Sequence, residues 1–177
     1  MAASDYDNVV RGKRMPRDSG QALVEFALSA TIMLTLVFGL VDFSRAIYIA
    51  QVIANLTGEG SSMASRGTTL SDTASAVVAA SGPLNLNVSG RVIVSSVFNT
   101  GSKIQLTGQV SQGGLSASSR VGSAIGGTAI LPSTVVPQAN QTVYVTEVFY
   151  KYKPITPIGN LLTGTVLPSQ LYDVAYY

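Results

Sequence analysis

The sequence contains no cysteine and no histidine. These two absences exclude thiolate nucleophiles, disulfide bonds, thiolate zinc sites, imidazole bases and histidine haem ligands. Carboxylates remain as metal ligands, but Asp72, Glu147 and Asp173 are scattered along the chain without the dense spacing of a calcium loop. We therefore expect neither a metal nor a cofactor.

Charged residues are also scarce. They make up 11% of the 177 residues, with Lys+Arg 11 against Asp+Glu 9, and the mean hydropathy is +0.35. Soluble domains usually carry about a quarter of charged residues, so a membrane segment would explain part of both values. The balanced charge, and the lack of a basic stripe with interleaved aromatic side chains, argue against a nucleic-acid partner.

The same inventory disfavours an enzyme. The sequence shows no convergent pair of acids and no glycine-rich phosphate loop. A hydrolase that uses serine and lysine remains formally open, although no serine lies in a motif and few lysines exist to act as a base. We expect a structural or binding protein.

One long apolar run dominates the N-terminal part of the chain. Residues 21–41 read QALVEFALSATIMLTLVFGLV, and Glu25 is the only charged residue among them. About 20 apolar residues in a helix span the roughly 30 Å of a bilayer core. Four basic residues precede the run and place the N-terminus in the cytoplasm: Arg11, Lys13, Arg14 and Arg17. A secretory signal peptide is the competing interpretation, but it has a shorter apolar core followed by a cleavage site.

Beyond Val41 the pattern becomes one-sided. Apolar residues recur at the i, i+3, i+4 spacing of an amphipathic helix, at Phe43, Ala46, Ile47, Ala50, Ile53 and Ala54. We therefore predict one helix over residues 21–64, apolar all round in its first half. Asp42 and Arg45 are three residues apart, and we expect them to form a solvated pair where the helix leaves the membrane.

The remaining residues predict a short helix and several strands. LSDTASAVVAAS, residues 70–81, favours a helix capped by Ser71. Residues 88–98 and 103–110 flank a turn signal and predict a β-hairpin, and residues 142–153 predict the strongest strand. The C-terminal QLYDVAYY favours an edge strand, and the Ser- and Gly-rich residues 111–141 form a long loop.

The predicted fold class is therefore α+β, with a long N-terminal transmembrane helix followed by a small antiparallel β-sheet domain. We expect residues 1–20 to be a cytoplasmic leader. Residues 65–177 form the sheet domain, which we expect to lie outside the cytoplasm and to fold without the helix.

The start of the apolar run raises a question of charge. Gly20 lies at its edge, and an acid and an aromatic residue follow at Glu25 and Phe26. If a protease cut between Gly20 and Gln21, the new α-amine would lie one helical turn from Glu25. An ionised carboxylate in hydrocarbon is costly unless it is paired. We infer that the amine of a neighbouring subunit neutralises Glu25, so that the acid sets the register of assembly.

This arrangement resembles the prepilin cleavage site of type IV pilins. Residues 20–67 are similar to the TadE-like family of tight-adherence (type IVc) pilus proteins, which are minor pilins or pseudopilins. Their pattern G-x-A-x-V-E-F-A-L is matched by Gly20, Ala22, Val24, Glu25, Phe26, Ala27 and Leu28. Residues 142–159 also resemble the terminal strand of the family. Family members often carry a proline early in the apolar run, whereas this chain has Ser29-Ala30-Thr31, so a straighter helix is expected.

The resemblance implies a function. A prepilin peptidase would cleave after Gly20, and the helix would assemble with other pilins through an inner-membrane assembly platform. The sheet domain would lie in the periplasm of a bacterium, and the protein would act in pilus biogenesis or as a filament subunit. The alternative is an uncleaved single-pass membrane protein whose periplasmic sheet domain binds a partner. The size of the mature chain distinguishes the two.

Overall fold

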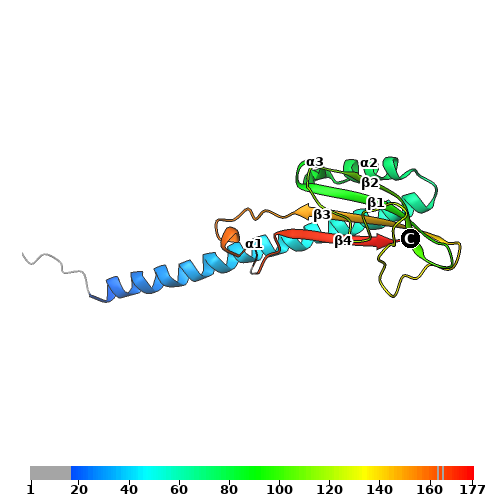
Figure 1. The fold of residues 1–177 in the computed structure, drawn as a ribbon. Coiled ribbons are helices and arrows are strands. Elements are labelled where there is room, and N and C mark those ends of the chain that lie inside the picture. The colour runs from blue at the N-terminus through cyan, green and yellow to red at the C-terminus, as the bar shows by residue number, and fades with distance from the viewer. Residues whose placement is uncertain (1–16, 163, 165) are drawn as a thin grey trace, which may run out of the picture.

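The computed structural model describes residues 17–162, 164 and 166–177. A 49-residue helix, α1 (Arg17–Ser65), forms a stalk that carries a globular head on its C-terminal half (Figure 1). Most of the leader expected over residues 1–20 lies outside the described residues. The last four of those residues, Arg17–Gly20, belong to α1.

The stalk is an uninterrupted helix. No proline breaks it, and its threonine hydroxyls find acceptors one turn back, from Thr31 to the Ala27 carbonyl and from Thr35 to the Thr31 carbonyl, both at 2.8 Å. Such internal bonds satisfy polar groups where no water is available. Among the described residues, this is the one helix long and apolar enough to cross a membrane, with a mean hydropathy of 2.1 over a window that is 0% buried.

The head is a four-stranded antiparallel sheet in the order β2-β1-β3-β4. The strands are β1 (Gly90–Asn99), β2 (Ile104–Gln112), β3 (Thr142–Lys151) and β4 (Gln170–Tyr176). The smaller helices are α2 (Leu70–Ala80), η1 (Gly82–Leu84), α3 (Leu86–Ser89) and α4 (Gly159–Leu162). The predicted α+β class, with a long helix and a small antiparallel sheet, is confirmed, as are the hairpin and the last strand.

The sheet is covered on both faces. Helices α1 and α2 lie on one face, here called the helix face, where α1 packs against β3 and β4 and α2 against β1 and β2. On the other, here called the loop face, residues from the segment after β2 pack over Val97, Leu106 and Val145. Because successive strand residues point to opposite faces, β3 serves both cores, with Val148 in one and Val145 in the other.

The second half of α1 is part of the head. Its side chains join the core of the helix face together with Val92, Val94 and Val148, and they recur at helical spacing: Ala46, Ile49, Ile53, Leu56 and Ala64. Full burial of one such aliphatic side chain stabilises a fold by about 1.5–3 kcal/mol. The helix therefore supplies one wall of the core, which argues against the prediction that the part after residue 64 folds without it.

The buried stripe of α1 also differs from the predicted one. Ala46 and Ile53 are buried as expected, but Phe43 and Ile47 are 51% and 45% exposed. The buried face is instead centred on Ile49, Ile53 and Leu56. Thr57 and Ser61 are fully buried, and their hydroxyls donate to the Asp173 carboxylate and the Ala175 carbonyl of β4.

The cap of α2 lies two residues before the predicted one. Thr69, in an extended conformation (ψ 151°), accepts a hydrogen bond from the Asp72 amide at 3.1 Å. Ser71 instead lies within the helix. An N-cap residue must have non-helical backbone angles, so Thr69 takes this position and the prediction for Ser71 is wrong.

Candidate functional site

The residues predicted to guide processing and assembly lie on the first turns of α1. Gly20, Gln21, Glu25 and Phe26 are all exposed, and Phe26 is 73% exposed. The Gln21 side-chain amide donates to Glu25 Oε1 at 2.9 Å. The helix thus brings positions 21 and 25 together, as their i, i+4 spacing requires.

Packing does not explain the glycine at position 20. A Cβ atom built there would meet no described heavy atom within 4 Å, and no positive φ is recorded for this residue. Alanine would be the better helix former by roughly 1 kcal/mol. The described structure therefore gives no packing reason for glycine at this position.

The Gln21 side chain that binds Glu25 carries no charge. Its hydrogen bond satisfies one carboxylate oxygen and does not itself neutralise the negative charge. A carboxylate in this state is tolerated in water and is expensive in hydrocarbon.

A second acid lies where the stalk enters the head. Asp42 is 0% exposed, and its carboxylate accepts hydrogen bonds from the Ile155 amide at 3.0 Å, from the Thr156 amide at 3.4 Å and from the Thr156 hydroxyl. The expectation of a solvated Asp42 is therefore wrong. The segment after β3 crosses the helix at this point and replaces water as the source of hydrogen-bond donors.

Arg45 binds the same segment after β3 through its guanidinium group. Its Nη1 donates to the Lys153 carbonyl at 3.1 Å, and the Tyr152 hydroxyl donates to the Asp42 carbonyl at 2.8 Å. Asp42 and Arg45 together clamp residues 152–156 to α1. Sequence analysis missed Tyr152 and Thr156 because they are more than 100 residues away along the chain.

Gly159 completes this junction by its lack of a side chain. A Cβ atom at this position would lie 2.1 Å from Asp42 Oδ2 and 2.3 Å from Pro154 Cβ. These separations are far below a van der Waals contact, so no larger residue fits without displacing the carboxylate. The glycine is therefore a requirement of close approach.

A third acid, Glu147, is buried on the loop face. Its carboxylate accepts from the Ser119 hydroxyl, from the Arg120 amide at 2.8 Å and from the Tyr172 hydroxyl at 3.0 Å. The Arg120 guanidinium stacks over the Tyr172 ring with its Cζ 3.7 Å from the centroid, a favourable cation–π contact. Glu147 thereby anchors the long loop to the sheet, a role that the sequence did not reveal.

This cluster sets the protonation of Tyr172. Burial, and then the Glu147 carboxylate, raise the pKa of the Tyr172 hydroxyl above its ordinary value of about 10. A raised pKa in the folded state means that the stabilising contribution is complete below pH about 10 and is lost as the pH rises further. The loop anchor is thus insensitive to pH through the neutral range as far as Tyr172 is concerned.

Replacing Glu147 by alanine is expected to lower the free energy of unfolding by about 2–4 kcal/mol, because three hydrogen-bond donors lose the fully buried carboxylate that accepts from them. The measurement is the urea midpoint of the full chain in mild detergent. Glu59→Ala is the matched control, since Glu59 is exposed on α1 and should change stability by no more than about 0.5 kcal/mol. An unchanged midpoint for Glu147→Ala would contradict the anchoring role.

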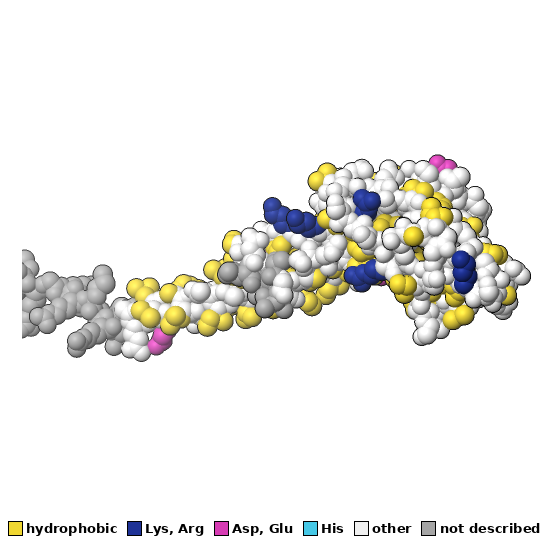
Figure 2. All heavy atoms as spheres, viewed as in Figure 1, with side chains coloured by type: hydrophobic (Ala, Val, Ile, Leu, Met, Phe, Trp, Pro, Cys, Tyr) yellow, Lys and Arg dark blue, Asp and Glu magenta, His cyan; other side chains and the backbone are white. Residues whose placement is uncertain are grey.

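The next feature is the distribution of charged and hydrophobic side chains over the described residues. No group of three or more carboxylates that could hold a metal ion occurs in the part of the chain that the structure describes. Figure 2 shows instead a stalk covered with hydrophobic side chains, and Lys and Arg side chains near the neck and on the head. This distribution is typical of a protein held in a membrane by one end.

Residues 20–62 match a family model described as TadE-like protein. The resemblance predicted from the sequence is thus confirmed over the stalk, and it associates the protein with tight-adherence pili and their components. The likeness noted for residues 142–159 lies outside the matched range. No curated protein and no solved structure matches the chain.

Proposed function

We propose that this protein is a minor pilin, or pseudopilin, of a tight-adherence pilus, cleaved after Gly20 and assembled through α1. The observation that carries the proposal is the stalk itself. An apolar helix, exposed over its first half and built into a globular head over its second, has the TadE-like segment along its length. The proposal assigns the protein a structural role and no catalytic step.

The geometry of the first turn suits cleavage. The bond between Gly20 and Gln21 lies four residues into α1, at the end of the helix, where terminal turns fray. Unwinding one terminal turn is inexpensive compared with opening the middle of a helix. A prepilin peptidase with its site at the cytoplasmic membrane surface is the proposed enzyme, and Gly20 presents it with an unobstructed backbone.

Assembly then follows from the charges. Cleavage creates an α-amine on Gln21, whose side chain already contacts Glu25. When stalks pack side by side, the amine of one subunit neutralises the Glu25 carboxylate of its neighbour. Buried polar pairs of this kind are best attested as devices that set register. The partners proposed are other pilins, the inner-membrane assembly platform and membrane lipid, with the head in the periplasm.

Gly20→Leu is expected to abolish processing, and Gly20→Ala to slow it, because each adds a side chain where the peptidase reads bare backbone. The readout is the size and N-terminal sequence of the membrane-bound protein in cells that express the peptidase. Gly39→Ala serves as the control, since a Cβ atom there also meets nothing within 4 Å.

A parent chain that still begins near Met1 in those cells would contradict the proposal. That result would favour the alternative, an uncleaved single-pass membrane protein whose head binds a partner in the periplasm.

A further inference from the structure

The connection between β3 and β4 is longer than is needed to join two neighbouring antiparallel strands. The two strands are antiparallel neighbours, and a hairpin of two to five residues would join them. Instead 18 residues lie between Lys151 and Gln170. They form a protrusion at the end of the head nearest the exposed half of the stalk (Figure 1). The described residues 154–162, 164 and 166–168 of this protrusion are called the collar below.

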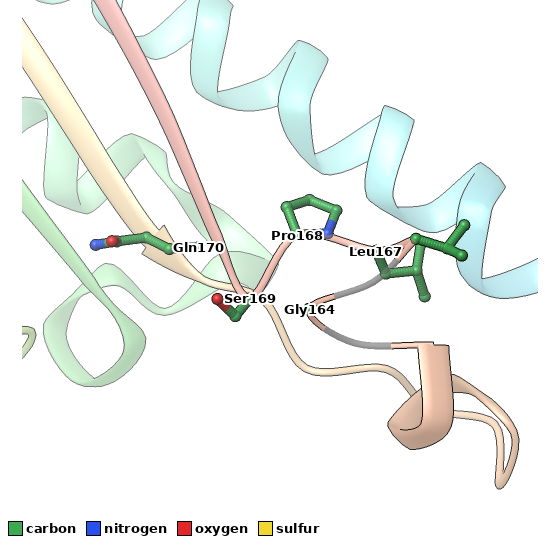
Figure 3. A pocket seen from close by; sticks show the side chains of 6 residues that line it. Gly164, Leu167, Pro168, Ser169 and Gln170 are labelled. Carbon is green, nitrogen blue, oxygen red and sulfur yellow. The ribbon is translucent and has the colours of Figure 1, made fainter.

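Contacts with α1 give the level of the collar along the stalk. Its first residues bind the Asp42 carboxylate, and Val166 and Leu167 line a groove together with Leu36 and Leu40 of α1. Leu36 precedes Asp42 by six residues, which is about 9 Å at roughly 1.5 Å per residue. The collar therefore descends about 9 Å beside the apolar run. Figure 3 shows Leu167 and Pro168 beside this helix.

The collar exposes large apolar side chains at this level. Val166 is 65% exposed and lines the groove with Leu36 at 68% and Leu40 at 66%. Ile155, whose amide binds Asp42, is 64% exposed. Leu167, in contrast, is 2% exposed and fastens the collar to the core. Val166 thus continues the apolar surface of the stalk, which itself requires a lipid environment.

The backbone of the collar is prepared for a place with little water. Irregular backbone at membrane depth is tolerated only where its polar groups are satisfied. The Asp42 carboxylate accepts hydrogen bonds from the Ile155 and Thr156 amides. The Gly159 amide donates to the Thr156 hydroxyl at 3.1 Å. The Gly164 amide donates to the Leu167 carbonyl at 2.8 Å. At the edge of a bilayer these two amides would have no water to bind, so the buried Asp42 carboxylate supplies their acceptor.

Positive charge lies immediately above the collar. Lys151 and Lys153 are exposed, and Arg45 binds the Lys153 carbonyl one turn above Asp42. Long basic side chains at this level reach phosphate groups while their stems lie against apolar surface. The order along the stalk, apolar collar below and lysines above, matches the order of acyl chain and headgroup in one leaflet.

We propose that the collar is a second membrane-binding element, which inserts Ile155 and Val166 into the leaflet next to the head and places Lys151 and Lys153 among anionic lipid headgroups. The insertion depth of about 9 Å agrees with that of interfacial segments, which is about 5–10 Å. The proposal rests on insertion of α1, as in the proposed function. It adds that the collar sets how far the stalk enters the membrane and prevents the head from tilting freely.

The test uses the full chain with single cysteines, since the sequence contains none. An environment-sensitive fluorophore is attached to Ile155→Cys or Val166→Cys, and vesicles of phosphatidylcholine and phosphatidylglycerol carry nitroxide quenchers near the top of the acyl chain. Leu34→Cys reports the stalk, and Ile125→Cys, 69% exposed on the long loop, reports the head. We expect quenching at positions 155 and 166, as at 34, and none at 125.

Other outcomes distinguish insertion of the collar from insertion of α1. Quenching at position 34, with positions 155 and 166 behaving like 125, would overturn the collar and leave the membrane anchor intact. No quenching at position 34 would overturn both. If positions 155 and 166 respond only when many chains share a vesicle, the collar is an interface between copies and the lipid proposal is wrong.

Charge reversal examines the headgroup contact. Lys151→Glu with Lys153→Glu should reduce collar insertion by at least about fivefold per lysine in vesicles that contain phosphatidylglycerol. Phosphatidylcholine alone should show little difference between the variant and its parent. Lys103→Glu, at an exposed lysine of the head, is the matched control. Equal insertion of the double variant and its parent in anionic vesicles would contradict the proposed role of the two lysines.

Discussion

Replacing Glu25 by leucine is expected to leave membrane insertion and cleavage intact and to abolish pilus assembly. Insertion should improve, because an acid in the apolar run costs roughly 1–3 kcal/mol on translocon scales. Assembly should fail, because the α-amine of a neighbouring Gln21 would be buried without its counter-charge. Breaking one side of a buried pair costs on the order of 3–5 kcal/mol, which corresponds to a loss of about 100-fold or more in association.

The environment of Glu25 in the structure means that this substitution tests contacts between molecules and not the folding of one chain. The residue is exposed on the isolated stalk, and its recorded contact is with the uncharged Gln21 amide. Little folding energy therefore depends on it, and a defect must arise between molecules. Glu25→Gln should be intermediate, since it retains an acceptor without the charge. Glu59→Gln, at an exposed acid of the same helix, should assemble like the parent.

Crosslinking to partner pilins, together with pilus counts on the same cells, measures the effect. If Glu25→Leu crosslinks and makes pili like the parent, the pairing account is wrong. A single-pass anchor would show gain or no change, so the two candidate functions give opposite results for one substitution.

Asp42→Ala is expected to release the collar from the stalk at a cost of about 3–5 kcal/mol. The substitution removes the acceptor of two backbone amides and one hydroxyl, at Ile155 and Thr156. An unsatisfied buried donor costs about 1–3 kcal/mol. The cores on both faces of the sheet remain, so the loss should be local. Asp42→Asn retains one acceptor oxygen and should lose less.

Hydrogen exchange of the Ile155 and Thr156 amides gives the direct measurement. Protection at these two amides should fall in Asp42→Ala, while the amides of β1 and β3, which pair along their length, remain protected. Glu59→Ala, at an exposed acid of the same helix, should leave all of them unchanged. Equal protection of both amides in Asp42→Ala and the parent would show that the carboxylate does not hold the segment.

Much of the architecture was predictable because it depends on neighbours in the sequence. The apolar run over residues 21–41 predicts the stalk by its length alone, and the turn signal at Asn99–Ser102 predicts the β1–β2 hairpin. The β-branched and aromatic residues of 142–153 likewise predict β3. The i, i+4 spacing of Gln21 and Glu25 on one face of a helix also follows from the chain itself, and in the structure the Gln21 amide donates to the Glu25 carboxylate.

The burial of the acids was decided only by the tertiary structure. Asp42 and Glu147 appear in the sequence as a boundary charge and a scattered carboxylate, yet both are 0% exposed. Their donors include Thr156, 114 residues from Asp42, and Tyr172, 25 residues from Glu147. A polar group is buried only where partners satisfy it, and those partners are known only once the chain has folded.

The rotation of α1 was also decided by tertiary packing. The spacing of apolar residues predicts Phe43 and Ile47 on the buried face, but the sheet covers the face of Ile49 and Leu56 instead. The buried Thr57 and Ser61 hydroxyls donate to Asp173 and Ala175 of β4. The sequence by itself determined that the protein has a membrane-length helix and a small antiparallel sheet. Which side of the helix meets the sheet, and where the collar lies along it, depends on hydrogen bonds between segments about 110 residues apart.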